Sequence, residues 1–142
     1  MRKRRDIKFF IIESDMMSES ELTQAINSID YAEVIGSASS LQLGLVSMAG
    51  RNPDIVLLNY EMITRNVQRA LQEIRRINKD IEIILVSETR ATSAESSQKA
   101  LELGAMYFIK KADGSKLQHN IKYYHRYLKP VIDLYRIGQP AK

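Results

Sequence analysis

Three short, uninterrupted apolar runs constrain the fold of this chain more than any other feature. The runs are Phe9–Ile12, Ile55–Leu58 and Ile83–Val86. A strand with one solvated face alternates apolar and polar residues, whereas a continuous apolar run is expected where both faces are covered. With two weaker segments, the sequence predicts five strands: Lys8–Ile12, Glu33–Ser37, Asp54–Leu58, Glu82–Val86 and Met106–Ile109. Helical patterns separate them, so we predict an α/β chain, a doubly wound five-stranded parallel sheet with helices on both faces.

Amphipathic segments between and after these runs predict five helices. The first has apolar residues at helical spacing from Leu22 to Ile29, and Ser18 with Glu21 forms a capping-box pattern at its start. The others are expected at Leu41–Met48, at Val67–Ile74, in a segment that ends at Gly104, and from near Ser115 to Leu128.

Pro130 interrupts the fifth helical pattern and divides a domain of residues 1–129 from an extension of residues 130–142. Because proline lacks the backbone N–H, we predict that the fifth helix is extended or kinked at Pro130, or that a new helix begins at Val131. The five-helix domain is complete without the apolar side chains of the extension, so they must pack back on it, pair with a second copy or lead into another domain. Those side chains are Val131, Ile132, Leu134, Tyr135 and Ile137. We expect the region from Ser115 to Ile137 to make the functional contact, most simply in a homodimer.

Composition excludes several classes of function. The 142 residues are 44% hydrophobic and 27% charged, which fits one globular domain. The absence of cysteine excludes disulfides, thiolate catalysis and cysteine-ligated zinc. A basic start, Met1–Arg5, precedes an apolar stretch that ends at Glu13. This stretch is too short for an export signal or a membrane span, so we expect a cytoplasmic location with no membrane contact.

Charge is unevenly distributed along the chain. Met1–Arg5 has four basic side chains and no acid, and residues 110–142 have eight Lys or Arg against Asp113 and Asp133, while the body between them is acidic. Basic ends can contact nucleic acid or an acidic protein surface, but solvated side chains on a terminal helix explain the same pattern. No helix-turn-helix segment follows, so direct nucleic-acid binding would be nonspecific and salt-sensitive, and we do not expect it.

Polar side chains follow several of the predicted strands at the point where each strand ends. Glu13-Ser14-Asp15 follow the first strand, Asn59 the third, Ser87 the fourth and Lys110-Lys111 the fifth. In open α/β sheets, functional groups gather at the carboxyl ends of the strands. An acid, an amide, a hydroxyl and a lysine that converge there indicate a phosphoryl-transfer site that has lost part of its chemistry.

On these features the chain resembles the receiver domains of response regulators, the CheY-like, flavodoxin-like modules of bacterial two-component signalling. The receiver pattern spans residues 7–111 without a gap, and the joint spacing of its stretches is specific although each stretch is weak alone. The stretches are Ile7–Ile12, Glu33–Ala38, Pro53–Leu58, Ala70–Arg75 and Ala100–Ala105.

The resemblance assigns roles to the polar positions and shows which are altered. Two adjacent acids of the family fall on Glu13 and Ser14, and the phospho-acceptor aspartate falls on Asn59. The switch hydroxyl falls on Ser87 and the phosphate-pairing lysine on Lys111, so these two match while Ser14 and Asn59 do not.

Three further positions complete the comparison with the family. Phe108 is the switch aromatic of the fifth strand, and the prolines that receivers carry after the acceptor and after the lysine are Ile63 and Ala112 here. Structural explanations stay open for some of these residues: Ser87 as a small polar strand terminator and Phe108 as a permanently buried core ring.

Asn59 cannot perform the two functions of the family's acceptor aspartate, which are attack on the phosphoryl group and metal binding. A carboxamide is a poor nucleophile and carries no charge for a metal. Mg²⁺ usually needs one or two carboxylates together with phosphate oxygens. The residual candidates are Glu13, Asp15 and Glu61, so we expect Mg²⁺ binding to be weak or absent and predict no cofactor. Without a metal, Lys111 is expected to pair with Glu13 or with the side-chain oxygen of Asn59.

We interpret the chain as a pseudo-receiver, not an enzyme, that is not phosphorylated and signals through protein–protein contacts. The resemblance implies an interaction face on the fourth helix, fifth strand and fifth helix, which would bind a component of a histidine-kinase pathway or a second copy. Its candidate residues are Lys99, Glu102, Met106, Lys116, Lys122, Arg126 and Tyr135.

Two alternatives remain from the sequence. One is a working phospho-receiver in which Asn59 was introduced by mutation, which the further departures at Ser14 and Ile63 argue against. The other is the regulatory half of a DNA-binding transcriptional regulator, truncated before its effector domain.

Overall fold

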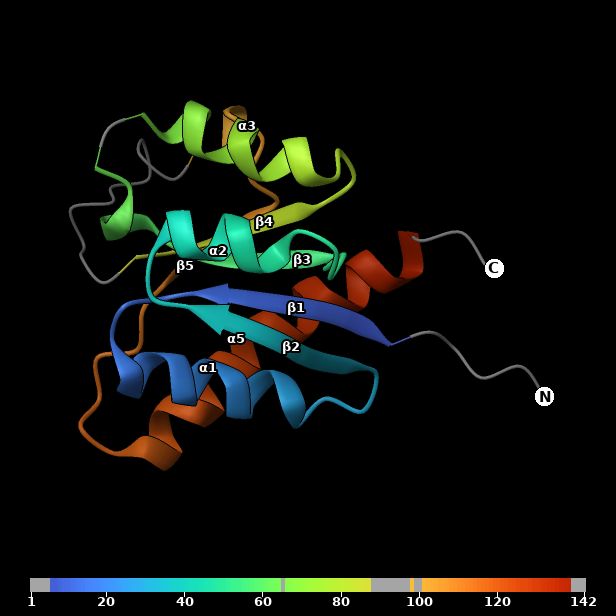
Figure 1. Cartoon of the computed structure of the whole chain (residues 1–142). Coiled ribbons are helices and arrows are strands. Elements are labelled where there is room, and N and C mark those ends of the chain that lie inside the picture. Colours follow the sequence, from blue (N-terminus) through green and yellow to red (C-terminus); the bar gives the residue numbers. More distant parts are fainter. Residues whose placement is uncertain (1–5, 65, 88–97, 99–100, 139–142) are drawn as a thin grey trace.

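The continuous apolar runs form the centre of a parallel sheet (Figure 1). A computed structural model of the chain describes residues 6–64, 66–87, 98 and 101–138, and its five parallel strands are ordered β2-β1-β3-β4-β5. The strands are β1 (Ile7–Ile12), β2 (Ala32–Ala38), β3 (Ile55–Asn59), β4 (Glu82–Ser87) and β5 (Tyr107–Lys110). Every predicted strand boundary lies within one residue of the observed boundary.

The register of the sheet aligns the carboxyl ends of its strands. Every residue of β3 is buried, as expected for a central strand covered on both faces. Asn59 at the end of β3 is opposite Val86 of β4, and Ser87 of β4 is opposite Lys110 of β5. The polar residues that follow these strands are therefore brought to one edge of the sheet.

Helices cover both faces of the sheet (Figure 1), which confirms the predicted flavodoxin-like fold class. α1 and α5 lie on one face, and α2 and α3 lie on the other, each pair over its own apolar cluster. The helices are α1 (Met16–Asn27), α2 (Leu41–Met48), α3 (Val67–Ile77) and α5 (Leu117–Gly138), with a 3₁₀ helix η1 (Tyr60–Met62) after β3.

The predicted helix that ends at Gly104 lies largely outside the described residues. Gln98, Leu101 and Glu102 are helical. Gly104 has φ of 108°, a conformation that glycine adopts without strain, and it leads into β5.

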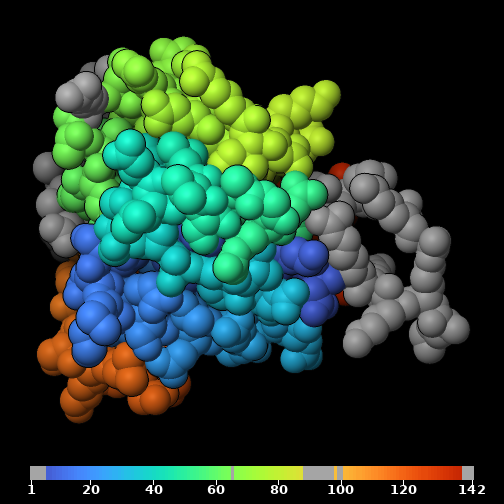
Figure 2. All heavy atoms as spheres, viewed as in Figure 1, coloured from blue at the N-terminus to red at the C-terminus, as the bar shows by residue number. Residues whose placement is uncertain are grey.

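The space-filling view in Figure 2 shows the side chains of α1, α2 and α3 closing over the sheet. α2 lies close to β1 because Gly44 has no side chain. A Cβ atom at Gly44 would lie 2.8 Å from Cδ1 of Ile12.

Within the described ranges, no helix is both long enough and apolar enough to cross a bilayer.

The start of α1 corrects the sequence prediction. The helix is capped by Asp15, whose side chain accepts hydrogen bonds from the Ser18 backbone N–H at 3.3 Å and from the Ser18 hydroxyl at 2.7 Å. The predicted capping box of Ser18 and Glu21 is therefore wrong. Glu21 is buried instead, where its carboxylate accepts a hydrogen bond from Nδ2 of Asn120 at 2.7 Å and joins α1 to α5.

The last helix runs through Pro130 without a break, so the prediction of a new helix at Val131 is wrong, whereas the predicted extension of the fifth helix is observed. Pro130 is exposed, and the missing N–H removes one hydrogen bond to the carbonyl of Arg126 on that side. Ile132 is completely buried, and Val131 and Tyr135 pack against the same core. Much of the described part of the extension thus packs back on its own domain, and its large hydrophobic side chains that stay exposed are Leu134 and Ile137.

Candidate functional site

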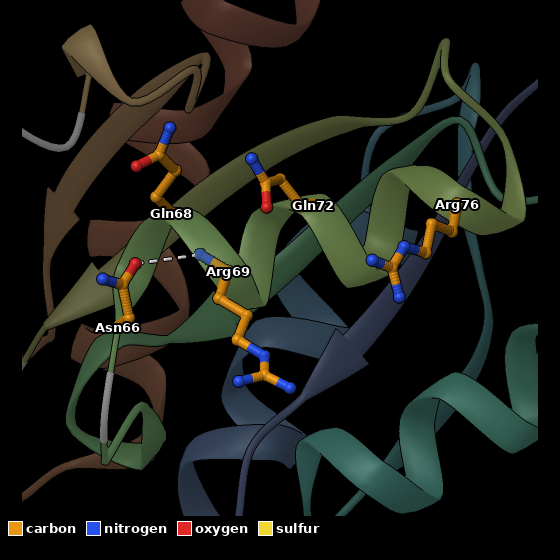
Figure 3. Close-up of a pocket in the computed structure, with 5 residues that line it drawn as sticks. All are labelled: Asn66, Gln68, Arg69, Gln72 and Arg76. Atoms are coloured by element: carbon orange, nitrogen blue, oxygen red, sulfur yellow. Dashed lines mark hydrogen bonds between the residues drawn. The ribbon is translucent and has the colours of Figure 1, made fainter.

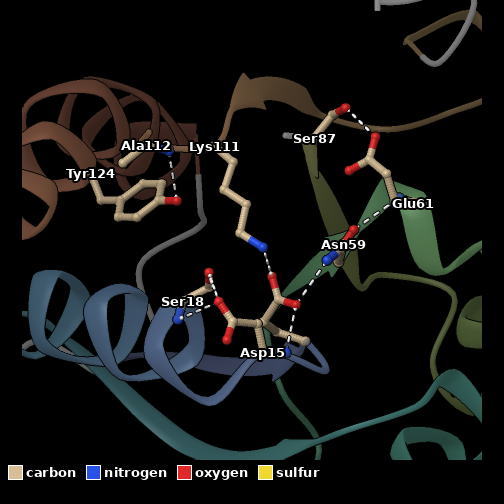
Figure 4. A network of polar contacts seen from close by, with 9 residues as sticks. Asp15, Ser18, Asn59, Glu61, Ser87, Lys111, Ala112 and Tyr124 are labelled. Carbon is tan, nitrogen blue, oxygen red and sulfur yellow. Dashed lines mark hydrogen bonds and ion pairs between the residues drawn. The ribbon is translucent and has the colours of Figure 1, made fainter. Parts of the chain in front are cut away.

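An ion pair stands at the centre of the strand-end edge. Nζ of Lys111, one residue beyond β5, lies 3.0 Å from Oε1 of Glu13, one residue beyond β1. The two side chains are only 8% and 1% exposed, so the pair is withdrawn from solvent. This contact confirms the predicted pairing of Lys111 with Glu13. Figure 4 shows the Lys111 side chain extending across the edge of the sheet into the space between Asn59 and Asp15.

Glu13 is held by donors on its second oxygen. Oε2 accepts a hydrogen bond from Nδ2 of Asn59 at 2.8 Å and from the backbone N–H of Asp15 at 3.1 Å. A charged oxygen that accepts two N–H groups is well stabilised in a buried place. The carboxylate therefore has counter-charge on one side and neutral donors on the other.

Asn59 is buried, and both ends of its amide are used. Nδ2 donates to Glu13, while Oδ1 accepts a hydrogen bond from the backbone N–H of Glu61 at 2.8 Å and caps η1. An ionised aspartate at this position could accept from Glu61 but could not donate to Glu13. The amide is thus fitted to this network, in which it links the end of β1 to the first turn after β3.

Ser87 makes a contact that the sequence did not predict. Its hydroxyl donates to Oε2 of Glu61 at 2.5 Å, and its carbonyl accepts from the backbone N–H of Lys111 at 2.5 Å. The sequence analysis named Glu61 only as a residual candidate for binding a metal ion. An acid two residues after the end of β3, next to a serine at the end of the neighbouring strand, was the signal that could have found this pair.

Ser14 and Asp15 lie at the same edge of the sheet, but their side chains have other roles. Ser14 is exposed, and the Asp15 carboxylate serves as the cap of α1. The hydrogen bond from the Ser18 hydroxyl, with a smaller contribution from the Lys111 charge, lowers the pKa of Asp15 below its ordinary value of 3.8. Asp15 is therefore an ionised helix cap, and its carboxylate is committed to Ser18.

For Phe108 of β5 the sequence left two interpretations open, a switch aromatic and a permanently buried core ring. Phe108 is half-buried and packs beside the α2–α3 face of the core. Its ring meets that of Tyr60 edge-on, with the ring centroids 5.6 Å apart. Tyr60 directly follows Asn59, so this contact joins β5 to the site through a residue that sequence reasoning did not single out.

The connection after Lys111 is fixed by α5. The backbone N–H of Ala112 donates to the hydroxyl of Tyr124 at 2.8 Å, a bond that a proline at this position could not make. Tyr124 is completely buried, and that burial raises the pKa of its phenol. The neutral phenol thus holds the backbone next to the lysine (Figure 4).

The side chains present do not fit the Mg²⁺ that the resemblance implies. No group of three His, Asp or Glu side chains suited to a metal ion occurs in the part of the chain that the structure describes. Glu13 faces an ammonium and two N–H donors, and the Glu61 carboxylate accepts from Ser87. Asn59 directs its NH₂ group toward Glu13, so a cation there would meet positive or N–H groups.

The predicted interaction face is only partly described. Lys99 lies outside the described residues. Glu102, Lys116, Lys122 and Arg126 are exposed, whereas Met106 and Tyr135 are half-buried and pack against the α1–α5 core. The described charged members of the face are thus exposed, whereas the two apolar members contribute mainly to the fold.

A shallow surface hollow lies away from the strand ends, on α3 (Figure 3). Asn66 caps the helix by accepting from the backbone N–H of Arg69 at 3.0 Å. The hollow is lined by Asn66, Gln68, Arg69, Gln72 and Arg76. These are solvated polar side chains along one helix, and no buried group points into the hollow from another described element.

The chain matches the family described as the response regulator receiver domain over residues 9–122. Among curated proteins it is similar to the protein-glutamate methylesterase/protein-glutamine glutaminase of Treponema pallidum (strain Nichols). The two are 27% identical over 119 residues, which cover 84% of this chain and 30% of the relative. The chain spans about a third of the length of the curated relatives it matches.

Two solved structures illustrate the likeness in fold. The response regulator domain of Thermotoga maritima CheB superposes with a TM-score of 0.75 at 23% identity, covering 96% of this chain and 100% of that domain. A complex of the P1 domain of CheA3 with CheY6 from R. sphaeroides gives a TM-score of 0.72 at 20% identity, covering 92% and 99% of the two chains.

Proposed function

The chain belongs to the family of response regulator receiver domains, and from this membership we propose that it is a receiver that does not accept a phosphoryl group and acts through protein contacts in a two-component-type pathway. One observation carries the proposal. The residue at the acceptor position is a neutral amide, Asn59, whose two ends are already engaged by Glu61 and Glu13.

Phosphoryl transfer needs a nucleophilic oxygen and stabilisation of the charge on the phosphoryl group. The amide oxygen of Asn59 is not a nucleophile of this kind, and it accepts the Glu61 N–H. Lys111, the cation that would face a phosphate, is paired at 3.0 Å with Glu13. The ion pair supports a site that is neutral without a metal or a phosphate.

Exposed apolar side chains at the same edge support a contact role. Met16 and Met17, at the start of α1, are largely solvent-exposed although α1 begins directly beside the ion pair. Methionine is frequent at surfaces that bind protein partners because its side chain adapts to different shapes. The proposed partner is a protein of a histidine-kinase pathway or a second copy of this chain.

We also propose that this chain has no enzymatic activity of its own and acts in the cytoplasm. The curated relatives that are named as methylesterases and glutaminases are about three times as long as the segment that matches this chain. The described residues at the strand ends form an ion pair and amide network whose parts hydrogen-bond one another, which favours a binding role over catalysis.

A phosphorylation assay tests the proposal. The chain is incubated with acetyl phosphate and Mg²⁺, and its intact mass is compared with that of Asn59→Asp and of the double variant Ser14→Asp/Asn59→Asp. The wild type is expected to gain no phosphoryl group, whereas the double variant regains the acids needed for a Mg²⁺-dependent adduct. A Mg²⁺-dependent, acid-labile adduct on the wild type that disappears in Asn59→Ala would refute the proposed function.

A further inference from the structure

The Glu13 carboxylate holds a primary amine and a primary amide at the same time. Its Oε1 lies 3.0 Å from Nζ of Lys111, and its Oε2 accepts a hydrogen bond from Nδ2 of Asn59 at 2.8 Å. The two oxygens share one carbon atom, so the amine and the amide are held next to each other. A lysine amine is a nucleophile once it has lost its proton, and the carbonyl carbon of a side-chain amide is an acyl group that it can attack.

The amide oxygen of Asn59 is held by a donor that would stabilise such an attack. Oδ1 accepts a hydrogen bond from the backbone N–H of Glu61 at 2.8 Å. N–H groups at this distance stabilise the negative charge that develops on a carbonyl oxygen under attack. Because Nδ2 is bound to Glu13 as well, both ends of the amide are fixed and its orientation is set before any reaction.

Burial of the three side chains favours a reaction among them. Glu13, Asn59 and Lys111 are all buried, which limits the access of water to the amide. Charges that are withdrawn from water are costly. Passage of one proton from the ammonium to the carboxylate leaves two neutral groups, so it is easier here than at the surface. Groups that are already in place also lose little further entropy when they react.

We propose that Lys111 and Asn59 form an intramolecular amide cross-link, with Glu13 as the proton carrier. A proton passes from the Lys111 ammonium to Oε1 of Glu13, and the neutral amine attacks Cγ of Asn59. The Cγ–Nζ bond forms while the carbonyl electrons move to Oδ1. Glu13 then gives its proton to Nδ2 and takes one from the attacking nitrogen. The carbonyl forms again, the Cγ–Nδ2 bond breaks, and ammonia leaves with the last proton as ammonium.

Two features keep this reaction slow. The backbone N–H of Asp15 also donates to Oε2 of Glu13, at 3.1 Å, which favours the ionised carboxylate over its protonated form. An amide is also a poor acyl group, because its nitrogen is a poor leaving group until it is protonated. The ion pair of the structure is therefore the starting state. Freshly purified chain is expected to hold the ion pair, and the cross-link is expected to accumulate over days.

The cross-link rests on the proposed function, because a metal ion or a phosphoryl group at the site would separate Lys111 from Glu13. It adds a covalent state to that site. The end of β3 becomes joined to the residue that follows β5, and the acceptor position is closed permanently. Each chain reacts once and consumes no other reactant, so the cross-link is a modification of the chain and not the turnover of a substrate.

Intact-mass spectrometry of the full chain, incubated at neutral pH and physiological temperature, tests the cross-link. The wild type is expected to lose the mass of one ammonia molecule. After trypsin digestion, residues 52–65, which contain Asn59, should be joined to residues 111–116, because trypsin does not cut after an acylated Lys111. The same chain kept unfolded in guanidinium chloride should keep its mass, since the three side chains are then no longer held together.

Variants assign the role of each group. Lys111→Arg keeps a cation without a nucleophilic amine, and Asn59→Ala removes the acyl group, so both should keep their full mass. Glu13→Gln keeps the shape of the side chain but cannot carry the proton, and the cross-link should form at least about a hundredfold more slowly. Lys110→Arg, the matched control next to Lys111, should react at the wild-type rate. Circular dichroism checks that each variant is folded.

Several outcomes would overturn the cross-link. A wild-type chain that stays folded and keeps its full mass excludes it, and this result does not depend on whether Glu13→Gln folds. Loss of ammonia that persists in Lys111→Arg would assign the loss to attack by a backbone nitrogen instead. Replacement of the Asn59 NH₂ group by OH, seen as a gain of mass, would assign the site to hydrolysis. Failure of the proposed function would appear differently, as a phosphoryl adduct in the acetyl phosphate assay, which none of these outcomes produces.

Discussion

Replacement of Glu13 by glutamine is expected to destabilise the fold more than any exposed charge substitution. Glu13→Gln keeps the shape of the side chain and one oxygen that can accept from Asn59 and Asp15. It removes the negative charge that faces the Lys111 ammonium at 3.0 Å. The lysine is then left as a buried cation with a neutral neighbour.

The magnitude follows from the burial of the pair. Two unit charges 3.0 Å apart attract by about 5 kcal/mol at an effective dielectric constant of about 20, but desolvation of both groups offsets much of this. When one partner of a buried pair is removed, the desolvation cost of the remaining charge is no longer offset, which lowers the free energy of unfolding by about 3 kcal/mol. With a urea m-value of about 1.5 kcal/mol/M, the unfolding midpoint should fall by about 2 M.

A double-variant cycle isolates the pair from the rest of the site. Lys111→Met should cost less, about 1–2 kcal/mol, because Glu13 keeps the Asn59 and Asp15 donors on its second oxygen. In Glu13→Gln/Lys111→Met both charges are gone, and the stability should return to within about 1 kcal/mol of the wild type. The expected coupling between the two positions is therefore about 3–5 kcal/mol.

Urea unfolding followed by circular dichroism at neutral pH measures all four proteins. Glu102→Gln, on an exposed helical residue, is the matched control and should change the unfolding free energy by less than about 0.5 kcal/mol. If Glu13→Gln costs no more than this control, or if the double variant loses the sum of the two single losses, the argument from a buried ion pair is wrong.

Two further outcomes follow from individual hydrogen bonds. The hydrogen bond from the Ser18 hydroxyl lowers the pKa of Asp15 in the folded state. The ionised carboxylate therefore stabilises the fold fully at a pH above the pKa of the unfolded state, which is about 4. This stabilisation is lost as the pH falls through the lower pKa of the folded state. Asp15→Asn keeps a capping oxygen and should therefore lose less unfolding free energy than the wild type between pH of about 5 and 2; equal losses in urea unfolding would contradict this. Tyr124→Phe leaves the Ala112 N–H without its acceptor and should cost about 1–2 kcal/mol, whereas Tyr127→Phe should cost less than about 0.5 kcal/mol. Burial raises the pKa of Tyr124, so the wild type should lose stability as the pH rises above the unfolded value of about 10, and Tyr124→Phe should lose less; parallel alkaline limbs would argue against a buried phenol.

The strands could be predicted from the sequence because their signal is local. A run such as Ile55–Leu58 is apolar throughout, and burial on both faces of a parallel sheet is the simplest way to cover it. Once the strands are placed, the polar residues that follow them must meet at one edge. The ion pair between Glu13 and Lys111 could therefore be predicted although the two residues are far apart in sequence.

The remaining features depend on contacts that no local pattern shows. Ser18 and Glu21 have capping-box spacing, but Asp15 provides an equally good cap one turn earlier, and Asn120 engages Glu21 from 99 residues away. The apolar side chains after Pro130 were interpreted as surplus because a domain of five helices is complete without them. A proline on the exposed side removes one hydrogen bond but leaves the apolar face of the helix intact, so Ile132 continues into the core.

The neutral side chains of Ser14 and Asn59 agree with the charge balance of the ion pair. With Ser14 and Asn59 both neutral, the Glu13 carboxylate is matched by the Lys111 ammonium, and the Asn59 amide supplies a further donor. An aspartate at position 59 alone would place a second carboxylate where Nδ2 now lies, 2.8 Å from Oε2 of Glu13. One lysine does not compensate two carboxylates at this distance, so one of them would take up a proton or the edge would have to open. The single variant Asn59→Asp is therefore expected to be less stable than the wild type, and under the proposed function a Mg²⁺-dependent phosphoryl adduct requires Ser14→Asp as well.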